Sequence, residues 1–335
     1  MGQKVGQQSV SFSQPPVITS SATIVGPEEG AGPLAQYFDW VIDDPLFGEK
    51  SWEKAECKML EESGKLALKK IKLETQDADL FLAGDLLNQI VSANYSARGL
   101  EIPFFGLFGA CSTFVEAMLL ASMLIDGGFA ERVLLASSSH HLTAERQFRF
   151  PVEQGVQRPA TGQWTATASG ALVVEAQGDG PRIVGGTIGK VVDMGITDMN
   201  NMGAAMAPAA ADTLLTHFKD TGTNPDSYDL IVTGDLGKVG QKLLIELLKK
   251  QGCNPADKLR DCGLMLYDTE KQDMHAGGSG CGCAAAVFAG YFYSELKEQK
   301  YKNILLMATG ALMSPITCQQ GESIPAIAHA VVVSS

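Results

Sequence analysis

Apolar runs rich in β-branched residues recur along the chain and are separated by amphipathic segments. Such runs predict strands where glycine, proline or polar clusters bound them. The predicted strands of the first part are residues 17–25, 79–83, 102–108, 132–136 and 168–174. Those of the second part are residues 182–192, 230–233, 304–308 and 327–333. Because helical patterns alternate with these strands, we expect largely parallel sheets covered on both faces.

Helical spacing of apolar positions predicts the segments between the strands. Residues 52–71 follow Ser51, a predicted N-cap, and place apolar side chains on one face with Lys and Glu opposite. Residues 205–218 and 241–250 predict further helices of this kind.

Two other helical segments are predicted at the centre of the fold. Residues 111–126 are apolar on nearly every face, which predicts a helix buried on all sides. Gly127 and Gly128 end it. Residues 283–296 predict a second central helix.

The chain repeats itself. DLFLAGDL at residues 79–86 returns as DLIVTGDL at residues 229–236. Two further echoes keep the same order and pair residues 132–137 with 303–308 and residues 169–174 with 328–333. Repeats this long and this few indicate two similar α/β halves rather than a solenoid. We assign the halves to residues 1–178 and 179–335.

Two stacked halves predict five layers, in the order helix, sheet, central helices, sheet, helix. A site shared by such halves is expected at the seam between them. A chain of 335 residues is long enough to bury a core of this size.

The net charge of −12 bears on which partners the chain can bind. It argues against binding to a nucleic-acid backbone and against direct docking on anionic lipid. The longest nearly apolar run, residues 117–125, is too short to span a bilayer, and the N-terminus lacks a signal-peptide core. Seven cysteines with irregular spacing favour reduced thiols, and their spacing does not match a zinc site.

Cys111 is the first candidate for chemistry. It follows a strand-like run and opens the predicted central helix, where the helix dipole favours a thiolate. This setting is typical of a nucleophilic or anion-binding cysteine. The alternative is a small apolar residue of the core, where most free cysteines lie.

Polar residues at strand ends are the next candidates. Asp85 and Asp235 end equivalent strands, and Asn88 follows Asp85 by about one helical turn. Ligands of α/β sheets bind at this edge, although each Asp is equally typical of a helix cap. His140 follows the strand 132–136, and its alternative role is at the surface or in a cap. His275 is more typical of a loop than of a catalytic base.

Basic and glycine-rich segments complete the set. Arg146, Arg149 and Arg158 lie near aromatic residues and would suit a flat carboxylate, although salt bridges to the many acids are at least as expected. A glycine-rich turn that contains Ser279 precedes the second central helix, and Gly310 follows a strand. Both could present N–H groups to an anion; the alternative is close packing of backbone.

These motifs together resemble a known family over essentially the whole chain. The duplicated halves, with GACS at residues 109–112, resemble the thiolase and ketoacyl synthase superfamily. Within it, the chain resembles the stage V sporulation protein AD (SpoVAD) family of spore-forming bacteria. The segments that carry this closer resemblance are LAGDLLNQ at 82–89, FGACST at 108–113, TAERQFR at 143–149, AMAPAAADT at 205–213, AGGSGC at 276–281 and ESIPAIAH at 322–329.

The resemblance implies a protein of sporulation and germination that binds dipicolinic acid, free or as its calcium chelate, for uptake into the developing spore. It implies membrane-embedded SpoVA proteins as partners and no cofactor. It implies a location on the cytoplasmic side of the forespore or spore inner membrane, held there through protein partners. It also implies a homodimer formed through the strand at residues 104–108, because an apolar edge strand would otherwise be an aggregation hazard.

The chain departs from the enzymes of the superfamily. Ketoacyl synthases of the Cys-His-Asn type place a His after the strand equivalent to 230–233, where this chain has Gly234 and Asp235. The second thiolase Cys is replaced by Thr309-Gly310, and Met274–Gly277 only loosely matches the thiolase Gly-His-Pro. Cys111 therefore lacks the bases that condensation needs, so the resemblance implies binding without catalysis.

The expected ligand-binding residues are Asp85, Asn88, Cys111, His140, Arg146, Arg149, Ser279 and Gly310, with no metal held by the protein itself. Two other functions stay open. One is a Cys-dependent condensing enzyme or acyltransferase that uses coenzyme A or a carrier protein, with Cys111 as nucleophile. The other is a scaffold for membrane partners without affinity for a small ligand.

Overall fold

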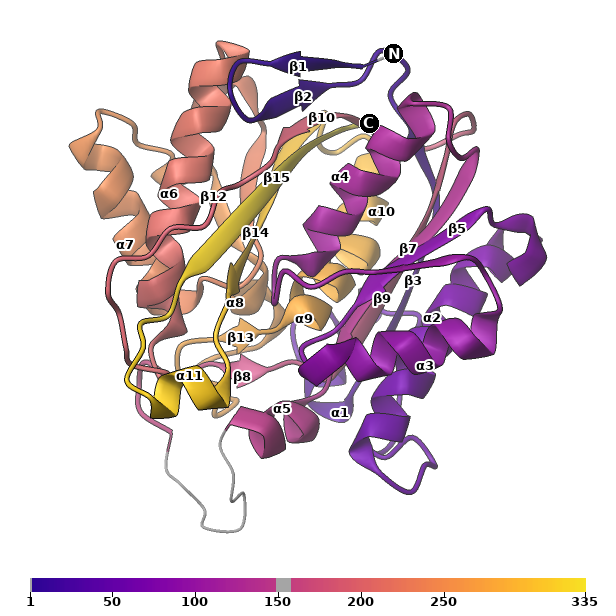
Figure 1. The fold of residues 1–335 in the computed structure, drawn as a ribbon, viewed down its shortest axis with the longest axis horizontal. Coiled ribbons are helices and arrows are strands. Elements are labelled where there is room, and N and C mark those ends of the chain that lie inside the picture. The colour runs from indigo at the N-terminus through magenta and orange to yellow at the C-terminus, as the bar shows by residue number, and fades with distance from the viewer. Residues whose placement is uncertain (1, 149–157) are drawn as a thin grey trace.

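The strands of the two halves form one mixed sheet in the computed structural model, which describes residues 2–148 and 158–335 (Figure 1). The strand order is β12-β11-β14-β15-β10-β3-β9-β7-β5-β6. The first half contributes β3 (Val17–Val25), β9 (Ala168–Glu175), β7 (Arg132–Ser139), β5 (Leu80–Gly84) and β6 (Phe104–Gly106). The second contributes β10 (Arg182–Thr187), β15 (Ala326–Ser334), β14 (Asn303–Ala311), β11 (Leu230–Thr233) and β12 (Leu259–Asp261).

The strand order is the same in both halves, as the repeat predicts. The two halves join where Val17 of β3 pairs with Arg182 of β10. The predicted boundary at residues 178/179 falls in the connection just before β10, and the division into domains stays a prediction.

The sheet is mixed, so the expectation of largely parallel strands was wrong. In each half the two outer pairings are parallel, β5 with β6 and β7, and β11 with β12 and β14. β9 and β15 are antiparallel to both of their neighbours. β9 returns beside β7 and β15 beside β14, and adjacent strands joined without a crossover run antiparallel.

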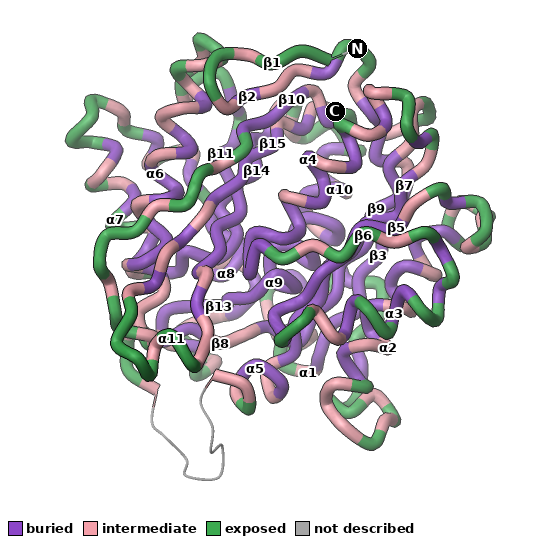
Figure 2. Tube along the Cα trace, in the orientation of Figure 1, coloured by how far each residue is buried: buried purple, intermediate pink, exposed green. Residues whose placement is uncertain are grey.

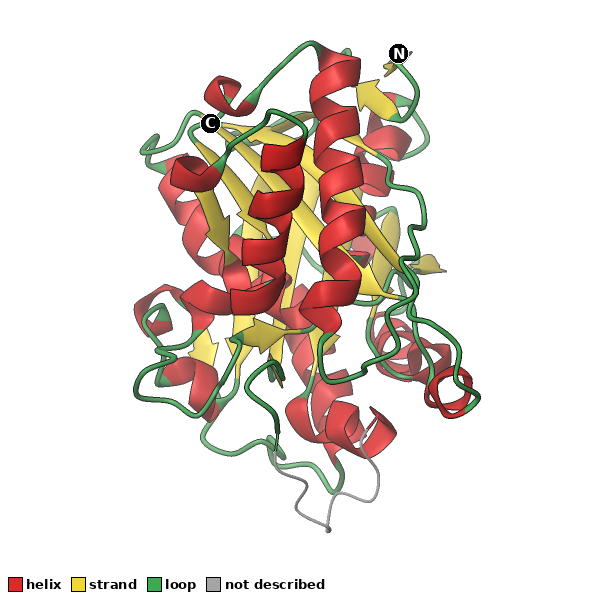
Figure 3. Cartoon of the chain, turned by 90° about the vertical axis from the view of Figure 1, so that its left-hand side faces the viewer, coloured by secondary structure: helices red, strands yellow, loops and turns green. Residues whose placement is uncertain are grey.

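Helices cover the sheet on its outer faces and fill the space between the halves, which gives the expected five layers (Figures 1 and 3). α2 (Trp52–Lys70) and α3 (Val91–Leu100) pack on the first half. α6 (Met202–Thr221) and α7 (Gly237–Lys250) pack on the second half and stand in front of the strands in Figure 3. The central layer consists of α4 (Thr113–Asp126), α9 (Cys281–Val287), the π-helical turn η7 (Phe288–Phe292) and α10 (Tyr293–Lys297).

The two central helices differ in burial (Figure 2). Every residue of α9 is buried. α4 was expected to be buried on all sides, but Met123 is 40% exposed and Leu120 is only half-buried. One stripe of α4 therefore faces outward, and its apolar character matters below.

The shorter elements close the ends of the fold. They are β1 (Gln3–Val5), β2 (Ser9–Ser11), α1 (Pro27–Gly30), η1 (Ala35–Tyr37), β4 (Trp40–Val41), η2 (Thr75–Asp77), η3 (Asn88–Ile90), α5 (His141–Phe148), β8 (Trp164–Thr165), η5 (Pro225–Ser227), η6 (Ala256–Lys258), α8 (Cys262–Leu266), β13 (Gly278–Ser279) and α11 (Pro315–Gln319). The predicted strand 182–192 is shorter than expected. β10 ends at Thr187, and the Gly189 N–H donates to Nδ1 of His329 (3.1 Å) instead of extending the ladder. Among the described residues, no helix is both long enough and apolar enough to cross a bilayer.

Candidate functional site

Cys111 lies in a tight turn just before α4. The helix begins at Thr113 with Ser112 as N-cap, so Cys111 precedes it rather than opening it as the sequence predicted. The turn holds Ala110 in the left-handed region (φ 50°). The Cys111 side chain is buried against Leu86 and Cys281, with Phe148 and Leu312 packed on the same cluster.

The electrostatic setting of the thiol is the opposite of that expected. Burial raises the pKa of Cys111 well above its usual value, and the nearby Asp235 carboxylate raises it further. A raised pKa leaves little thiolate at neutral pH, and the thiolate is the nucleophilic form. The turn therefore does not activate the Cys111 thiol through the helix dipole.

Asp235 organises the floor of the site. It follows β11 and is fully buried, and burial raises its pKa. Its carboxylate accepts hydrogen bonds from Ser279 Oγ (2.9 Å), the Gly280 N–H (3.0 Å) and Thr309 Oγ1 (3.2 Å). Ser279 Oγ lies 3.8 Å from Cys111 Sγ. The residue was recognised in the repeat, yet it was not among the expected ligand-binding residues.

Gly310 and Ser279 are both brought to Cys111, as expected. Gly310 approaches the Cys111 turn so closely that a Cβ atom there would lie 1.9 Å from the carbonyl oxygen of Gly109 and 3.2 Å from the Ser112 nitrogen. The close-packing alternative therefore accounts for the glycine at this position.

Asp85 serves as a backbone cap. Its side chain is fully buried, and its two oxygens accept from the N–H groups of Leu87 (2.7 Å) and Ala93 (2.8 Å). These bonds hold the turn between β5 and α3. Burial raises the pKa of Asp85 to about 6.

His140 is likewise structural. Its Nε2 bonds the carbonyl oxygen of Pro45 (2.8 Å), and its Nδ1 accepts from the Leu142 N–H (3.2 Å). Both ring nitrogens are thus engaged, and burial lowers the pKa of the imidazole. His275 also lies in a loop, where Nδ1 contacts the Pro159 carbonyl oxygen (2.9 Å) and Nε2 pairs with Asp273 (2.7 Å).

A crevice of about 300 Å³ opens beside the buried cluster. Leu86 and Phe148 belong both to the cluster around Cys111 and to the crevice lining. The exposed Asn88 lies on the wall, and its role in ligand binding stays a prediction. The full lining is Leu86, Leu87, Asn88, Gln89, Ile90, Phe108, Gln147, Phe148, Met313 and Ser314.

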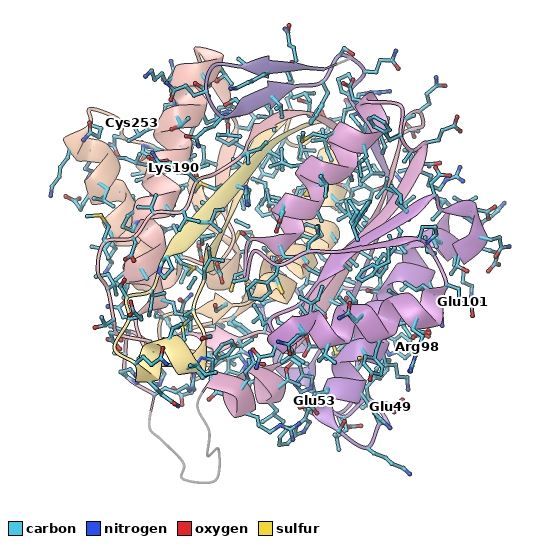
Figure 4. The ribbon with its side chains drawn as sticks, viewed as in Figure 1. Glu49, Glu53, Arg98, Glu101, Lys190 and Cys253 are labelled. Carbon is cyan, nitrogen blue, oxygen red and sulfur yellow. The ribbon has the colours of Figure 1, made fainter. Side chains whose placement is uncertain are left out.

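The expected arginines do not reach this crevice in the described part of the chain. Arg146 pairs with Glu53 of α2, which is labelled in Figure 4, and its guanidinium lies over the Trp52 ring. Arg149 lies outside the described residues. Arg158 lies over the Trp164 ring and donates to the Asp273 carbonyl oxygen (2.7 Å).

A buried carboxyl that the sequence analysis missed lies behind the crevice wall. Glu56 of α2 is 1% exposed and accepts from Thr143 Oγ1 (2.7 Å) and Ser138 Oγ (3.2 Å). Burial raises its pKa to about 8, and the neighbouring Asp85 contributes. The signal was present in the sequence, because Glu56 falls on the same helical face as Met59 and Leu60.

Comparison with known proteins places the chain in context. The family model of Stage V sporulation protein AD (SpoVAD) matches residues 6–334. The chain is 50% identical to the Stage V sporulation protein AD of Bacillus subtilis (strain 168) over 327 residues, which covers 98% of this chain and 96% of that protein.

Solved structures with the same fold include a 3-oxoacyl-(acyl-carrier-protein) synthase III and variants of OleA. A 3-oxoacyl-(acyl-carrier-protein) synthase III from Aquifex aeolicus VF5 superposes with a TM-score of 0.58 at 16% identity, covering 96% of this chain and 100% of that one. A variant of OleA from Xanthomonas campestris superposes with a TM-score of 0.62 at 14% identity, covering 97% of this chain and 100% of that one. At this identity the likeness establishes a shared thiolase-like fold and nothing about the reaction.

Proposed function

The chain belongs to the stage V sporulation protein AD family and has a role in sporulation, and from this premise we propose that it binds dipicolinic acid without catalysing a reaction. The binding would serve uptake of this small aromatic dicarboxylate into the developing spore. The proposed site is the crevice beside Cys111, whose volume of about 300 Å³ suits a single small ligand.

The observation that carries the proposal is the pairing of Cys111 with an acid. Burial raises the pKa of the thiol, and Asp235, which follows β11, raises it further. A nucleophilic cysteine needs a base or a cation that lowers this pKa. The thiol is therefore suited to pack against a ligand and poorly suited to attack one.

The crevice lining also bears on the form of the ligand. Among the lining residues that the structure describes, Asn88, Gln89, Gln147 and Ser314 are polar and none is basic. Among these described lining residues a dicarboxylate dianion would have no cation to pair with, whereas its calcium chelate carries no net charge. We therefore favour the chelate as the ligand.

Calorimetric titration with dipicolinate, with and without calcium, tests the proposal. We expect saturable binding that is stronger with calcium, no turnover of acyl-CoA, and weaker binding by Cys111→Ala. Acylation of Cys111 by acyl-CoA without dipicolinate binding would return the protein to the condensing enzymes. If the protein neither binds dipicolinate nor is acylated at Cys111, a scaffold for membrane partners is the favoured function.

Arg146→Gln is expected to leave dipicolinate affinity unchanged. The Arg146 side chain is 47% exposed and is directed to Glu53, so its ion pair is worth at most about 1 kcal/mol. Titration of the variant beside the wild type, together with urea unfolding, checks this expectation. A tenfold loss of affinity would place the guanidinium in the binding site after all.

We also propose a homodimer and protein partners. β6 is an edge strand on which Phe105 is 52% exposed, and the following Phe108 is 50% exposed. The outward stripe of α4, with Met123, is apolar as well. Pairing of β6 with a second copy would cover this edge. Membrane-embedded SpoVA proteins would then hold the dimer at the cytoplasmic face of the forespore or spore inner membrane.

A further inference from the structure

Two buried carboxyls lie near each other behind the crevice wall. Glu56 comes from the buried face of α2, and Asp85 directly follows β5. Their side chains are 1% and 0% exposed. Ser92, in the first turn of α3, adjoins both carboxyls. Figure 4 labels Glu53 and Arg98, which lie on the helices that contribute Glu56 and Ser92.

Each wall of the crevice is attached to one member of this pair. Glu56 accepts from Thr143 Oγ1 of α5, the helix that ends in the lining residues Gln147 and Phe148. Asp85 accepts from the N–H groups of Leu87 and Ala93, which bracket the other wall.

Gln147 ties the two walls together across the crevice. Its Oε1 accepts from the Asn88 N–H (2.9 Å), and its Nε2 donates to the Leu86 carbonyl oxygen (3.0 Å). The wall between β5 and α3 also holds Gln89 and Ile90 in the left-handed region, with φ of 55° and 47°. Such strained residues persist only while surrounding contacts hold them. A weakened carboxyl pair would therefore loosen both walls.

Only one carboxyl of the pair is ionised at neutral pH. Burial raises the pKa of Glu56 to about 8, and Asp85 adds to this rise. Burial also raises the pKa of Asp85 to about 6. At neutral pH the pair therefore holds one proton and one negative charge.

Within the described part of the chain, the surroundings offer no compensation for a second charge. In the described ranges, no basic side chain is among the groups that shift the pKa of either carboxyl. Among the described residues, Cys57 of α2 and Cys281 of α9 also face the pair. Burial raises the pKa of both thiols, and the carboxyls raise it further. His140, before α5, has its pKa lowered by burial. The Glu53–Arg146 ion pair spans α2 and α5 at the surface.

We propose that the Glu56–Asp85 pair retains its proton while the crevice is closed on a ligand and loses it when the walls loosen, so that ligand binding is coupled to proton uptake. This inference rests on the proposed function, because it takes the crevice as the ligand site. Glu56 would be a positioning residue, acting on the ligand through α5 and the turn after β5.

The direction of the pH effect follows from the raised pKa values. A carboxyl whose folded pKa exceeds its unfolded value contributes stability at low pH and loses it as pH rises through the folded pKa. For Glu56 this window runs from the ordinary glutamate pKa of 4.5 to about 8. Above it, two adjacent buried carboxylates repel each other. We expect affinity for the ligand to fall about tenfold between pH 7 and pH 9, the effect of a one-unit pKa change on binding.

The test is calorimetric titration of the full chain with calcium dipicolinate from pH 6 to pH 9, in buffers of different ionisation enthalpy. The wild type should bind about tenfold more weakly at pH 9 and take up protons at pH 8. Glu56→Gln, a neutral mimic of the protonated acid, should bind with little change across this range. Glu62→Gln is the matched control on the same helix, where Glu62 pairs with Lys65 at the surface, and should follow the wild type.

A second variant shifts the pH at which the affinity falls and leaves the titrating carboxyl in place. The Ser138 hydrogen bond lowers the pKa of Glu56, so Ser138→Ala should move the fall in affinity to higher pH. The same pH dependence in wild type and Glu56→Gln, or an unmoved midpoint in Ser138→Ala, would overturn the proposal.

A measurement without ligand separates this inference from the proposed function. Hydrogen exchange at the Leu87 and Ala93 amides, taken as the ratio of wild type to Glu56→Gln at each pH, should rise between pH 7 and pH 9. If dipicolinate binds at no pH while this exchange ratio rises, the proposed ligand is wrong. The coupling of the carboxyl proton to the crevice walls is then still supported. If the ratio stays constant, that coupling is wrong whatever the ligand.

Discussion

Gly310→Ala is expected to lower the free energy of unfolding by about 3 kcal/mol and to abolish the proposed binding of dipicolinate. The added Cβ would lie 1.9 Å from the Gly109 carbonyl oxygen, so β14 or the Cys111 turn must move. Both are backbone, and neither has a flexible side chain that could yield. Urea unfolding and calorimetric titration measure the two effects.

Gly195→Ala is the matched control for this substitution. Gly195 has a φ of 74°, and a Cβ atom there would meet nothing within 4 Å. Its cost is only that of left-handed backbone, about 1 kcal/mol, with binding intact. If Gly310→Ala cost no more than this and still bound dipicolinate, the Cys111 turn would be more yielding than its packing indicates.

The overall architecture could be predicted from the sequence because it rests on patterns that survive without tertiary contacts. The runs at 79–86 and 229–236 became β5 and β11, each followed by a buried Asp. The central layer followed from its apolar composition. The α4 stripe that faces outward could not be predicted, because an exposed Met123 and a buried one have the same hydrophobicity.

The hydrogen-bond and ion-pair partners of the candidate site residues could not be predicted from the sequence. The position of Asp85 at a strand end was right, but its oxygens are taken by amides two and eight residues later. Arg146 pairs with Glu53 only because α5 packs beside α2. For His140, likewise, the partner is the carbonyl oxygen of Pro45, 95 residues away. Spacing along the chain locates an edge of the sheet, whereas tertiary packing decides where each polar atom finds its partner.

Asp235→Asn is expected to make Cys111 more reactive toward a small thiol reagent such as methyl methanethiosulfonate. The Asp235 carboxylate raises the pKa of the thiol, so its removal lowers that pKa. Each unit of decrease gives about tenfold more thiolate at neutral pH. The rate at Cys111, followed against pH by mass spectrometry, measures the change.

The same substitution should also destabilise the protein. Ser279 Oγ, the Gly280 N–H and Thr309 Oγ1 all donate to the Asp235 carboxylate, and an amide oxygen cannot satisfy all three. Leaving one buried donor unpaired costs about 1–3 kcal/mol. The acid therefore stabilises the site floor while it suppresses the thiol.

Asp261→Asn is the control for Asp235→Asn. Asp261 is also buried, with its pKa raised to about 6, and it accepts from the Leu236 N–H (2.8 Å). It is not among the groups that shift the pKa of Cys111, so the rate at Cys111 should stay that of the wild type. An unchanged rate in Asp235→Asn would mean that burial alone suppresses the thiol. Acylation of Asp235→Asn by acyl-CoA would instead mean that this one acid separates the proposed binding function from acyl-transfer chemistry.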